Sequence, residues 1–412
     1  MSAIPRARVV ACCGGMVIVG GAERMTFAAL RALIQSGARV HCILNGWAYE
    51  AIAIQADRIG ATWSTSAYRV RLTRRSPSLP ALARQVADTA RTSWDLLRVS
   101  WRVRATHVVV PSHDVAIRVW PAVALLRLLG RMVILMLHNA PVQTSFYRRL
   151  WRWVVSPVAS LFVCNSNYTR SELLACGVSP AKVSVIRYMV PDRETGHEAV
   201  APVEGRLIFI GQIIPEKGLH VLLEAVALLA GRGVAVSLDV VGDVEGWISP
   251  TYGDYREVLK ARAARPDLAD RVRFLGFRED VPALLGQAVL HCCPSLPDQR
   301  EAFGLVVLEA KAAGVPSVVF PTGALPELVT HGVDGWVCAA STPASLAEAC
   351  ETLLRDPIER ARLAVNARHA AGGFSAPAFA EAWRGVFDLE NTEAEVRPGA
   401  VAEVDAQGLP RA

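Results

Sequence analysis

The chain has 412 residues, of which 52% are apolar and 20% charged, and its formal net charge is +6. This length exceeds what one ordinary hydrophobic core organises, so we expect two domains of a soluble α/β protein. The nine cysteines are odd in number and contain no C-x2-C pair. They exclude a disulfide framework and a zinc site, and they favour reduced thiols in a cytoplasm.

Apolar stretches that could cross a membrane are interrupted. The most apolar region, Val119 to Leu137, contains Arg127, Gly130 and Arg131, whereas a spanning helix needs about 20 mostly apolar residues. The N-terminus also lacks a basic segment followed by an apolar run and a cleavage site, so we expect no secretory signal. The expected location is the cytoplasm, with peripheral attachment to the inner face of the plasma membrane as an option.

Short apolar strands alternate with helices along both halves of the chain, which is typical of parallel sheets. In the first half we predict a helix at Ala22–Ser36 and strands at Arg8–Cys13, Val40–Leu44, Thr106–Val110, Met132–Leu137, Leu161–Cys164 and Val183–Ile186. In the second half we predict strands at Leu207–Ile210, Ser237–Val241, Val289–Cys293, Ser317–Phe320 and Gly335–Cys338. We therefore expect a first domain over residues 1–191, a linker at 192–204 and a second domain over 205–375. Residues 391–412 have little apolar content and are predicted to form a disordered tail.

A glycine loop follows the first predicted strand, with Gly14-Gly15 at its start and Gly20-Gly21-Ala22-Glu23-Arg24 at its end. A dinucleotide site would need G-x-G-x-x-G here and an acidic residue after the second strand. Because that strand ends at Leu44-Asn45-Gly46 instead, we do not expect such a site. The glycine loop either borders a different ligand or is a tight turn without a ligand.

Positive charge is concentrated in the first half of the chain. Residues 1–195 contain 25 Lys and Arg against 9 Asp and Glu, while residues 196–412 contain 19 against 29. Between Leu82 and Arg102, helical spacing places two tryptophans, Trp94 and Trp101, on one face. The same spacing predicts four arginines on the opposite face: Arg84, Arg91, Arg98 and Arg102. Such a helix is either an ordinary domain helix or one that lies on an anionic membrane surface. A nucleic-acid partner is not expected, because no recognition motif is present.

Two motifs in the second half fit a phosphate-bearing ligand. After the strand Leu207–Ile210 comes Gly211-Gln212, and Lys217-Gly218 then opens a helix. Further on, Glu301-Ala-Phe303-Gly304-Leu305 precedes a helix that carries Glu309. A glycine at a helix start gives a ligand access to free N–H groups and to the positive end of the helix dipole. Solvated surface residues are the alternative for the lysine and for both glutamates.

With its flanking glycines and prolines, this series strongly resembles the retaining glycosyltransferases of family 4, which have the GT-B fold. The resemblance covers residues 205–345 most clearly and extends to 9–390. It implies two Rossmann-like doubly wound domains that face each other across a cleft, and a helix at 376–390 that crosses back onto the first domain. The family usually has an arginine where this chain has Gln212, which leaves one cation on the diphosphate unless another arginine supplies the second.

The resemblance implies roles for particular residues. Those with catalytic roles are His138, Glu301 and Lys217. Those that bind the donor are Gly15, Gln212, Lys217, Phe303, Gly304, Leu305 and Glu309. His138 follows the strand Met132–Leu137, and a capping histidine without a ligand is the alternative there. His113 is a weaker candidate for the same role.

We therefore expect a retaining glycosyltransferase that moves a sugar from a UDP- or GDP-linked donor to a hydroxyl acceptor. A bacterial polysaccharide or lipid-linked glycan is the expected acceptor, and a soluble sugar phosphate is a second option. No cofactor is expected beyond the nucleotide sugar, and no metal, because the chain lacks the D-x-D pair of the other glycosyltransferase fold. The alternative is a catalytically silent, nucleotide-sugar-binding partner of another transferase. The sugar, the base and the oligomeric state stay open.

Overall fold

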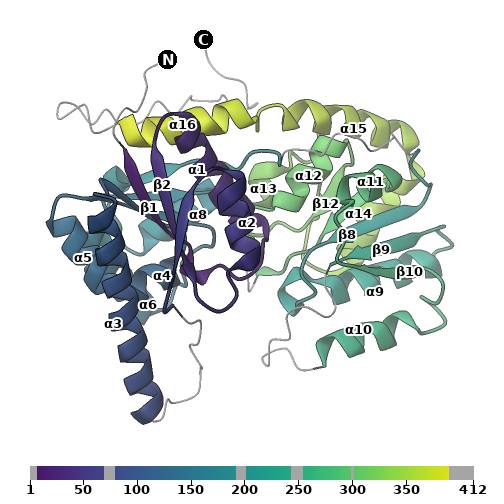
Figure 1. The fold of residues 1–412 in the computed structure, drawn as a ribbon. Coiled ribbons are helices and arrows are strands. Elements are labelled where there is room, and N and C mark those ends of the chain that lie inside the picture. Colours follow the sequence, from purple (N-terminus) through teal and green to yellow (C-terminus); the bar gives the residue numbers. More distant parts are fainter. Residues whose placement is uncertain (1–6, 69–78, 192–200, 243–253, 298–300, 389–412) are drawn as a thin grey trace.

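The chain folds around two parallel β-sheets that lie beside each other, each flanked by helices (Figure 1). The structure, a computed structural model, describes residues 7–68, 79–191, 201–242, 254–297 and 301–388. The predicted GT-B arrangement of two α/β sheets is confirmed. The boundaries proposed around the linker stay a prediction, because residues 192–200 lie outside the described ranges, as does the predicted tail at 391–412.

The first sheet has seven strands in the order β3-β2-β1-β4-β5-β6-β7. Its strands are β1 (Arg8–Cys12), β2 (Arg39–Asn45), β3 (Thr62–Ser66), β4 (His107–Val110), β5 (Met132–Leu137), β6 (Leu161–Cys164) and β7 (Val183–Val185). Its helices are α1 (Gly21–Gln35), α2 (Glu50–Arg58), α3 (Leu79–Arg102), α4 (His113–Arg118), α5 (Trp120–Leu128), α6 (Ser145–Leu150), α7 (Ser156–Val158) and α8 (Asn167–Ala175). Short turns of helix are η1 (Cys13–Gly15), η2 (Trp151–Val155) and η3 (Pro180–Lys182).

The second sheet has six strands in the order β10-β9-β8-β11-β12-β13. Its strands are β8 (Arg206–Ile210), β9 (Ser237–Val241), β10 (Val272–Gly276), β11 (Leu290–Cys293), β12 (Ser317–Val319) and β13 (Gly335–Val337). Its helices are η4 (Pro215–Lys217), α9 (Leu219–Gly231), α10 (Tyr255–Ala263), α11 (Val281–Gln287), α12 (Leu305–Ala313), α13 (Leu325–Leu328), α14 (Pro343–Arg355) and α15 (Pro357–Ala371). The last described helix is α16 (Ala376–Asp388).

Two strands, β3 and β10, are absent from the sequence-based prediction, and each lies at an edge of its sheet. The central strands are buried on both faces, so they form continuous apolar runs such as the one in β5. An edge strand has fewer covering neighbours and tolerates polar residues. For this reason neither edge strand shows a clear apolar run: β3 consists of Thr, Trp and Ser, and β10 contains Arg273.

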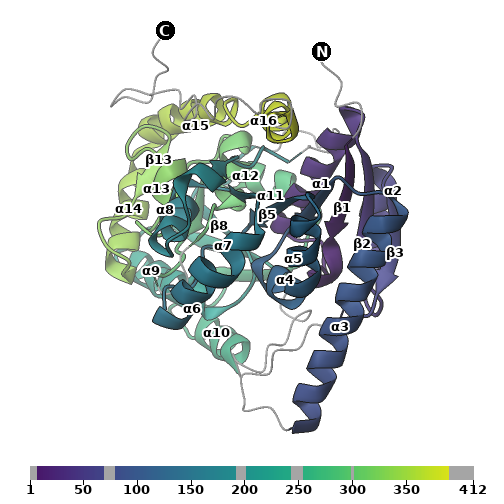
Figure 2. The ribbon, with the colours of Figure 1, turned by 90° about the vertical axis from the view of Figure 1, so that its left-hand side faces the viewer.

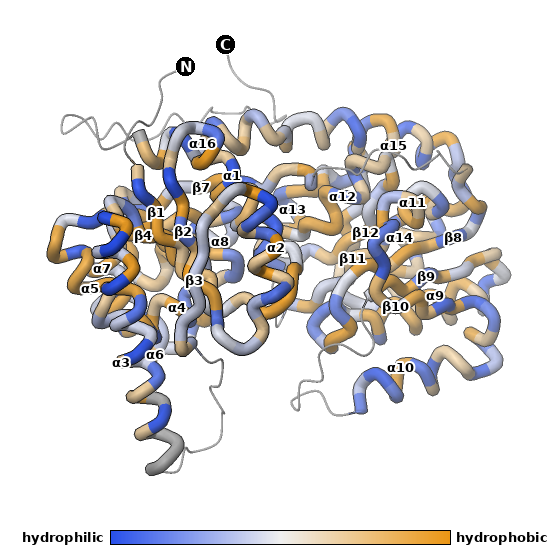
Figure 3. Tube along the Cα trace, in the orientation of Figure 1, coloured by the Kyte–Doolittle hydropathy of each residue, from blue (hydrophilic) through white to orange (hydrophobic). Residues whose placement is uncertain are grey.

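One hydrophobic core joins the two halves of the molecule. It combines side chains of α1 and β1 with Phe303, Val307 and Leu325 from the second half and with Trp383 of α16. Helix α16 packs against α1 and α15 packs against α12, so the C-terminal helices run along one side of both sheets (Figure 1). The hydropathy colouring shows mostly apolar residues in the central strands and mixed polar and apolar residues along the outer helices (Figure 3). The two sheets are therefore held against each other by buried apolar contacts.

Helix α3 turns a different side to the core than the sequence predicts. Leu96 and Val99 are buried, whereas Trp94 is 66% and Trp101 73% exposed. Arg91, Arg98 and Arg102 are exposed as well, so tryptophans and arginines share the outer side of the helix. The prediction that they occupy opposite faces is wrong. At about 100° per residue the arginines fall beside the tryptophan line, and small polar residues such as Ser93 and Ser100 complete the buried side.

Candidate active site

The predicted donor residues gather where the carboxyl ends of strands from both sheets meet. Helix α1 begins after β1, η4 follows β8, and the segment with Glu301 follows β11. Ligands of doubly wound sheets bind at such edges. The N-termini of α1 and α12 approach so closely that a Cβ on Gly21 would lie 3.1 Å from Leu305 Cδ2. Two helix N-termini, both positive ends of helix dipoles, therefore converge on one place.

Lys217 and Glu301 form an ion pair in which Nζ lies 2.5 Å from Oε2. Ser295, two residues after β11, donates a second hydrogen bond to the same oxygen at 3.1 Å. Burial raises the pKa of the Glu301 carboxyl, but the charge and hydrogen bond of Lys217, with the Ser295 hydroxyl, hold this pKa below its ordinary value. Glu301 is therefore ionised at neutral pH. Sequence reasoning missed Ser295, although its place just beyond the carboxyl end of a predicted strand is a usable signal.

Two glycines allow the backbone to take the shape that this pair requires. Gly218 has a φ of +72° and lies so close to Pro294 that a Cβ would be 2.0 Å from its carbonyl oxygen. Gly304, the N-cap of α12, has a φ of +96°, and a Cβ there would be 2.8 Å from Leu325. L-residues avoid this left-handed region. The predicted helix starts beside Lys217 and Glu301 thus depend on glycine.

Glu309 contacts a cation from the opposite half of the molecule. Arg24 Nη1, in the first turns of α1, lies 3.3 Å from Glu309 Oε1. Burial raises the pKa of Glu309, and the charge and hydrogen bond of Arg24 only partly oppose this rise. Arg24 ends the glycine loop that the sequence singled out, but 285 positions separate it from Glu309. Only the folded chain shows that the arginine reaches the predicted donor site.

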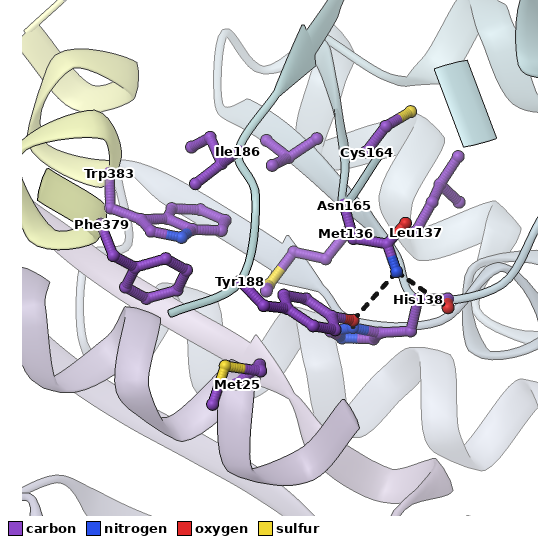
Figure 4. Close-up of a pocket in the computed structure, with 11 residues that line it drawn as sticks. Met25, Met136, Leu137, His138, Cys164, Asn165, Ile186, Tyr188, Phe379 and Trp383 are labelled. Carbon is purple, nitrogen blue, oxygen red and sulfur yellow. Dashed lines mark hydrogen bonds between the residues drawn. The ribbon is translucent and has the colours of Figure 1, made fainter. Parts of the chain in front are cut away.

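His138 lies just after β5, as predicted, and both of its ring nitrogens have partners in the protein. Nε2 lies 2.9 Å from Thr26 Oγ1 and Nδ1 lies 2.5 Å from the Tyr188 hydroxyl. Asn165 donates to the Tyr188 hydroxyl and to the His138 carbonyl (Figure 4). Burial lowers the pKa of His138 to about 4, so the imidazole is neutral at neutral pH. The cavity beside it measures about 10 Å³, enough for about one water, and cannot hold a sugar.

The remaining predicted residues lie in both halves of the molecule. Gly15 ends η1, where a Cβ would lie 2.8 Å from Val115. Gln212 is exposed between β8 and η4. The Phe303 ring is buried against Tyr188, with 4.6 Å between ring centroids. His113 starts α4 and packs against Trp151.

Contacts from α8 fasten the Glu301 segment to the first half of the molecule. Ser166 Oγ donates to the Ala302 carbonyl at 2.6 Å. The Glu327 carboxylate accepts hydrogen bonds from the backbone N–H groups of Asn167 and Tyr168. Glu327 thus caps the N-terminus of α8, and its charge stabilises that helix end.

Within the described ranges, no group of three or more His, Cys, Asp or Glu side chains could hold a metal ion.

Two family profiles match adjacent parts of the chain. The profile described as Glycosyltransferase Family 4 matches residues 19–192, and that described as Glycosyl transferases group 1 matches residues 197–370. Together they cover every strand of both sheets except β1, and every residue of the site except Gly15.

Curated relatives match over part of their length. A glycogen synthase of Mycobacterium tuberculosis is 30% identical over 220 residues, 52% of this chain and 50% of the relative. A D-inositol 3-phosphate glycosyltransferase of Salinispora tropica is 37% identical over 177 residues, 42% of this chain and 36% of the relative. One of the same description from Mycobacterium bovis is 30% identical over 277 residues, covering 63% and 55%. The chain thus spans about half the length of the curated relatives it matches.

Solved structures share the fold. The crystal structure of Anabaena HepE in complex with UDP and glucose has a TM-score of 0.74 at 20% identity, and the match covers 94% of this chain and 100% of that one. Sucrose-phosphate synthase from Thermosynechococcus elongatus has a TM-score of 0.72 at 16% identity with the same coverage.

Proposed function

Because the chain belongs to the glycosyltransferases of family 4, we propose that it is a retaining enzyme that moves a sugar from a nucleoside-diphosphate donor to a hydroxyl acceptor. One observation carries this proposal. The N-termini of α1 and α12 converge beside two cations, Lys217 and Arg24, and two carboxylates, Glu301 and Glu309. Positive groups suit a diphosphate, and carboxylates suit sugar and ribose hydroxyls.

In the proposed complex the diphosphate lies between Lys217 and the first N–H groups of α12, at Gly304 and Leu305. Lys217 then exchanges its contact with Glu301 for a phosphate oxygen, and Glu301 turns to the hydroxyls of the transferred sugar. Glu309 holds the ribose. Gly15 borders the acceptor side of the cleft. UDP is the proposed nucleotide, and the UDP-bound HepE structure, which shares the fold, supports this choice.

Arg24 supplies the second cation that Gln212 does not provide. It is 48% exposed, its flexible side chain already reaches the second half of the molecule, and its partner Glu309 is a predicted ribose ligand. A guanidinium can bind a phosphate through two parallel hydrogen bonds. When the diphosphate enters, Arg24 moves from Glu309 to a phosphate oxygen, and this leaves the carboxylate for the ribose.

The chemistry follows from where charge develops. The C–O bond between the anomeric carbon and the diphosphate breaks, and Lys217 with the helix N–H groups stabilises the leaving oxygen. The acceptor oxygen attacks the same face, and its proton passes to the departing phosphate. His138 is neutral and bonded on both sides, so we assign it a positioning role between α1 and Tyr188. These groups provide the positive charge that a metal would otherwise supply, and the chain lacks a D-x-D pair.

A lipid-linked acceptor at an anionic membrane fits the outer surface of the first sheet's helices. Large apolar side chains are exposed there on α3, α5, α6 and η2, and these elements lie on one side of the molecule (Figure 2). They are Trp94, Trp101, Leu125, Leu128, Phe146 and Trp153. Arginines lie among them, including Arg98, Arg102, Arg127, Arg148 and Arg152. Aromatic and basic side chains together favour anionic lipid surfaces.

This attachment would be peripheral. In the described part of the chain, every helix is too short or too polar to span a bilayer. Residues 1–191 would then present the acceptor, and residues 205–375 would bind the donor.

Donor hydrolysis in the absence of acceptor tests the proposal. UDP-glucose, GDP-mannose and ADP-glucose are incubated with the protein, and the anomer released first is identified by proton NMR. We expect slow hydrolysis of one donor with retained configuration, and its loss in the Glu301→Gln variant. An inverted first product would contradict the retaining mechanism. Stabilisation by UDP without hydrolysis would favour the catalytically silent partner, for which the unusual Gln212 is the supporting observation.

A further inference from the structure

A second cavity lies at the opposite end of the first sheet from the candidate active site. It has a volume of about 490 Å³, which falls in the size range of small-molecule sites. Its wall includes residues at the amino-terminal ends of β1 and β2 and at the C-terminal end of α3. The donor residues follow the carboxyl ends of their strands, so the length of the sheet separates the two places.

Four arginines contribute to this wall: Arg8, Arg39, Arg102 and Arg104. None of the described residues of the lining is a carboxylate. Arg8 and Arg39 are direct register partners on the adjacent parallel strands β1 and β2, a placement in which like charges repel each other. Among the residues that the structure describes, none of the four forms an ion pair. The described part of the fold therefore holds four positive charges around one cavity without a countercharge.

Arg104 occupies a backbone position that normally belongs to glycine. Its φ is +52°, and it follows α3 at the C′ position of a Schellman motif. The two defining hydrogen bonds are present, from Arg104 N to the Trp101 carbonyl at 3.0 Å and from Ala105 N to the Ser100 carbonyl at 2.8 Å. An arginine in this conformation is strained, and strained backbone positions are enriched at functional sites.

The other polar groups of the wall are oriented by the fold. His41 is buried, and its ring nitrogens lie 2.9 Å from the hydroxyls of Thr62 and Ser64. Burial and the charge of Arg102 lower the pKa of His41, so its ring adds no charge at neutral pH. The attraction for an anion thus comes from the four guanidinium groups.

We propose that this cavity binds a phosphate-bearing small molecule with at least two negative charges, at a site distinct from the donor site. Guanidinium groups bind phosphate through paired, charge-assisted hydrogen bonds. Such a ligand would neutralise the Arg8–Arg39 repulsion and engage the strained Arg104. A phosphorylated metabolite and the phosphate of a lipid headgroup share this chemistry.

Calorimetric titration with inorganic pyrophosphate at low salt tests the site. Because pyrophosphate also resembles the diphosphate of the proposed donor, the titrations use Lys217→Gln protein throughout. In this background Arg39→Gln with Arg104→Gln should weaken binding about tenfold or more, since a hydrogen bond to a charged group contributes that much. The matched control is Arg58→Gln, an exposed arginine outside the lining. It removes the same charge per site and should change the dissociation constant less than twofold.

Arg104→Gly separates binding from folding. Glycine relieves the left-handed strain, so without ligand the melting temperature should rise, while pyrophosphate binding should weaken. A rise in melting temperature with unchanged binding would overturn the proposal, as would equal affinities of the Arg39/Arg104 double variant and the Arg58→Gln control. The result does not depend on transferase activity, so loss of the proposed function would leave it unaffected.

Vesicles identify the source of the phosphate. The same variants are sedimented with phosphatidylcholine vesicles that contain or lack phosphatidic acid. Binding to phosphatidic acid that depends on Arg39 and Arg104, without pyrophosphate binding, would assign the site to a lipid headgroup. Arginine-dependent pyrophosphate binding without a vesicle effect would assign it to a free phosphorylated molecule. Failure of both would exclude the site.

Discussion

At the scale of single residues, the candidate site consists of charged groups that restrain one another. Lys217 and Glu301 are largely buried, with side-chain exposures of 29% and 15%. Each charge offsets part of the free-energy cost of burying the other. Burial lowers the pKa of Lys217, but the Glu301 charge raises it above its ordinary value, so both groups stay ionised. The pair thus keeps a cation and a carboxylate ready for ligand at neutral pH.

Replacing Lys217 by alanine tests this pair. Among the side chains that the structure describes, Ser295 would remain as the partner of Glu301, and the free energy of unfolding should fall by about 1–3 kcal/mol, the cost of a lost hydrogen bond to a charged group. Donor turnover should fall about 10²–10³-fold, as for other lost transition-state contacts. Urea unfolding and donor hydrolysis measure these effects. Lys260→Ala, which removes an exposed pair with Glu257, should change neither. Turnover within threefold of the wild type would exclude a role for Lys217 in leaving-group stabilisation.

At the scale of elements, glycines set how helices start beside the ligand. Gly218 and Gly233 share a left-handed backbone, with φ values of +72° and +74°. They differ in their surroundings, since a Cβ on Gly218 would meet the Pro294 carbonyl, whereas open space surrounds Gly233. The two positions therefore separate backbone strain from steric exclusion.

Gly233→Ala should cost about 1–2 kcal/mol of unfolding free energy, the strain of a left-handed L-residue. Gly218→Ala should cost more, because the Pro294 backbone must also move, and it should abolish donor binding by displacing Lys217. Chemical unfolding and calorimetry with UDP measure the two effects. Equal losses of stability in both variants would show that contact with Pro294 does not matter.

Helix α3 offers a second test at this scale. Trp94→Gln with Trp101→Gln should reduce binding to vesicles of anionic lipid and leave the melting temperature unchanged, because both side chains are exposed. Leu96→Ala, on the buried side, should instead destabilise the protein by about 2–5 kcal/mol. Flotation with vesicles and thermal unfolding distinguish the variants. Unchanged flotation of the tryptophan variant would remove the proposed membrane surface from α3.

At the scale of the whole molecule, buried histidines couple stability to pH. Burial lowers the pKa of His107 and His138 to about 4 and that of His291 to about 3. Between about pH 6.5 and pH 4 the unfolded chain therefore binds more protons than the folded one. The stabilisation is complete above pH 6.5 and is lost as the pH falls towards 4. The raised pKa values of Glu23 and Glu309 act in the opposite direction.

Urea unfolding at pH 7.5 and pH 5.0 should show a smaller free energy of unfolding at the lower pH. Each such histidine contributes a decrease of about 2 kcal/mol, and the two glutamates offset part of the total decrease. His138→Gln removes one titrating group and should shrink the difference between the two pH values. An equal difference between the two pH values in the wild type and in His138→Gln would show that the fold does not hold His138 neutral.

The sequence by itself determined the features that depend on neighbouring residues. Continuous apolar runs such as Met132–Leu137 reveal strands buried on both faces, and the glycines beside Lys217 and Glu301 reveal helix starts, because both signals are local. The order of these motifs was enough to identify the fold. The edge strand Thr62–Ser66 was not predicted, because a strand with fewer covering neighbours needs no apolar run.

Only the tertiary structure decided which groups meet. The partners Lys217 and Glu301 are 84 positions apart, and Arg24 and Glu309 are 285 apart, so no local pattern links them. The same holds for the hydroxyls of Thr26 and Tyr188, which form hydrogen bonds with the His138 ring, and for the side of α3 that faces the core. Such pairings follow from how two sheets and their connecting helices pack, and packing sums weak contacts over the whole chain. A residue's neighbours across the cleft therefore become known only when the chain is folded.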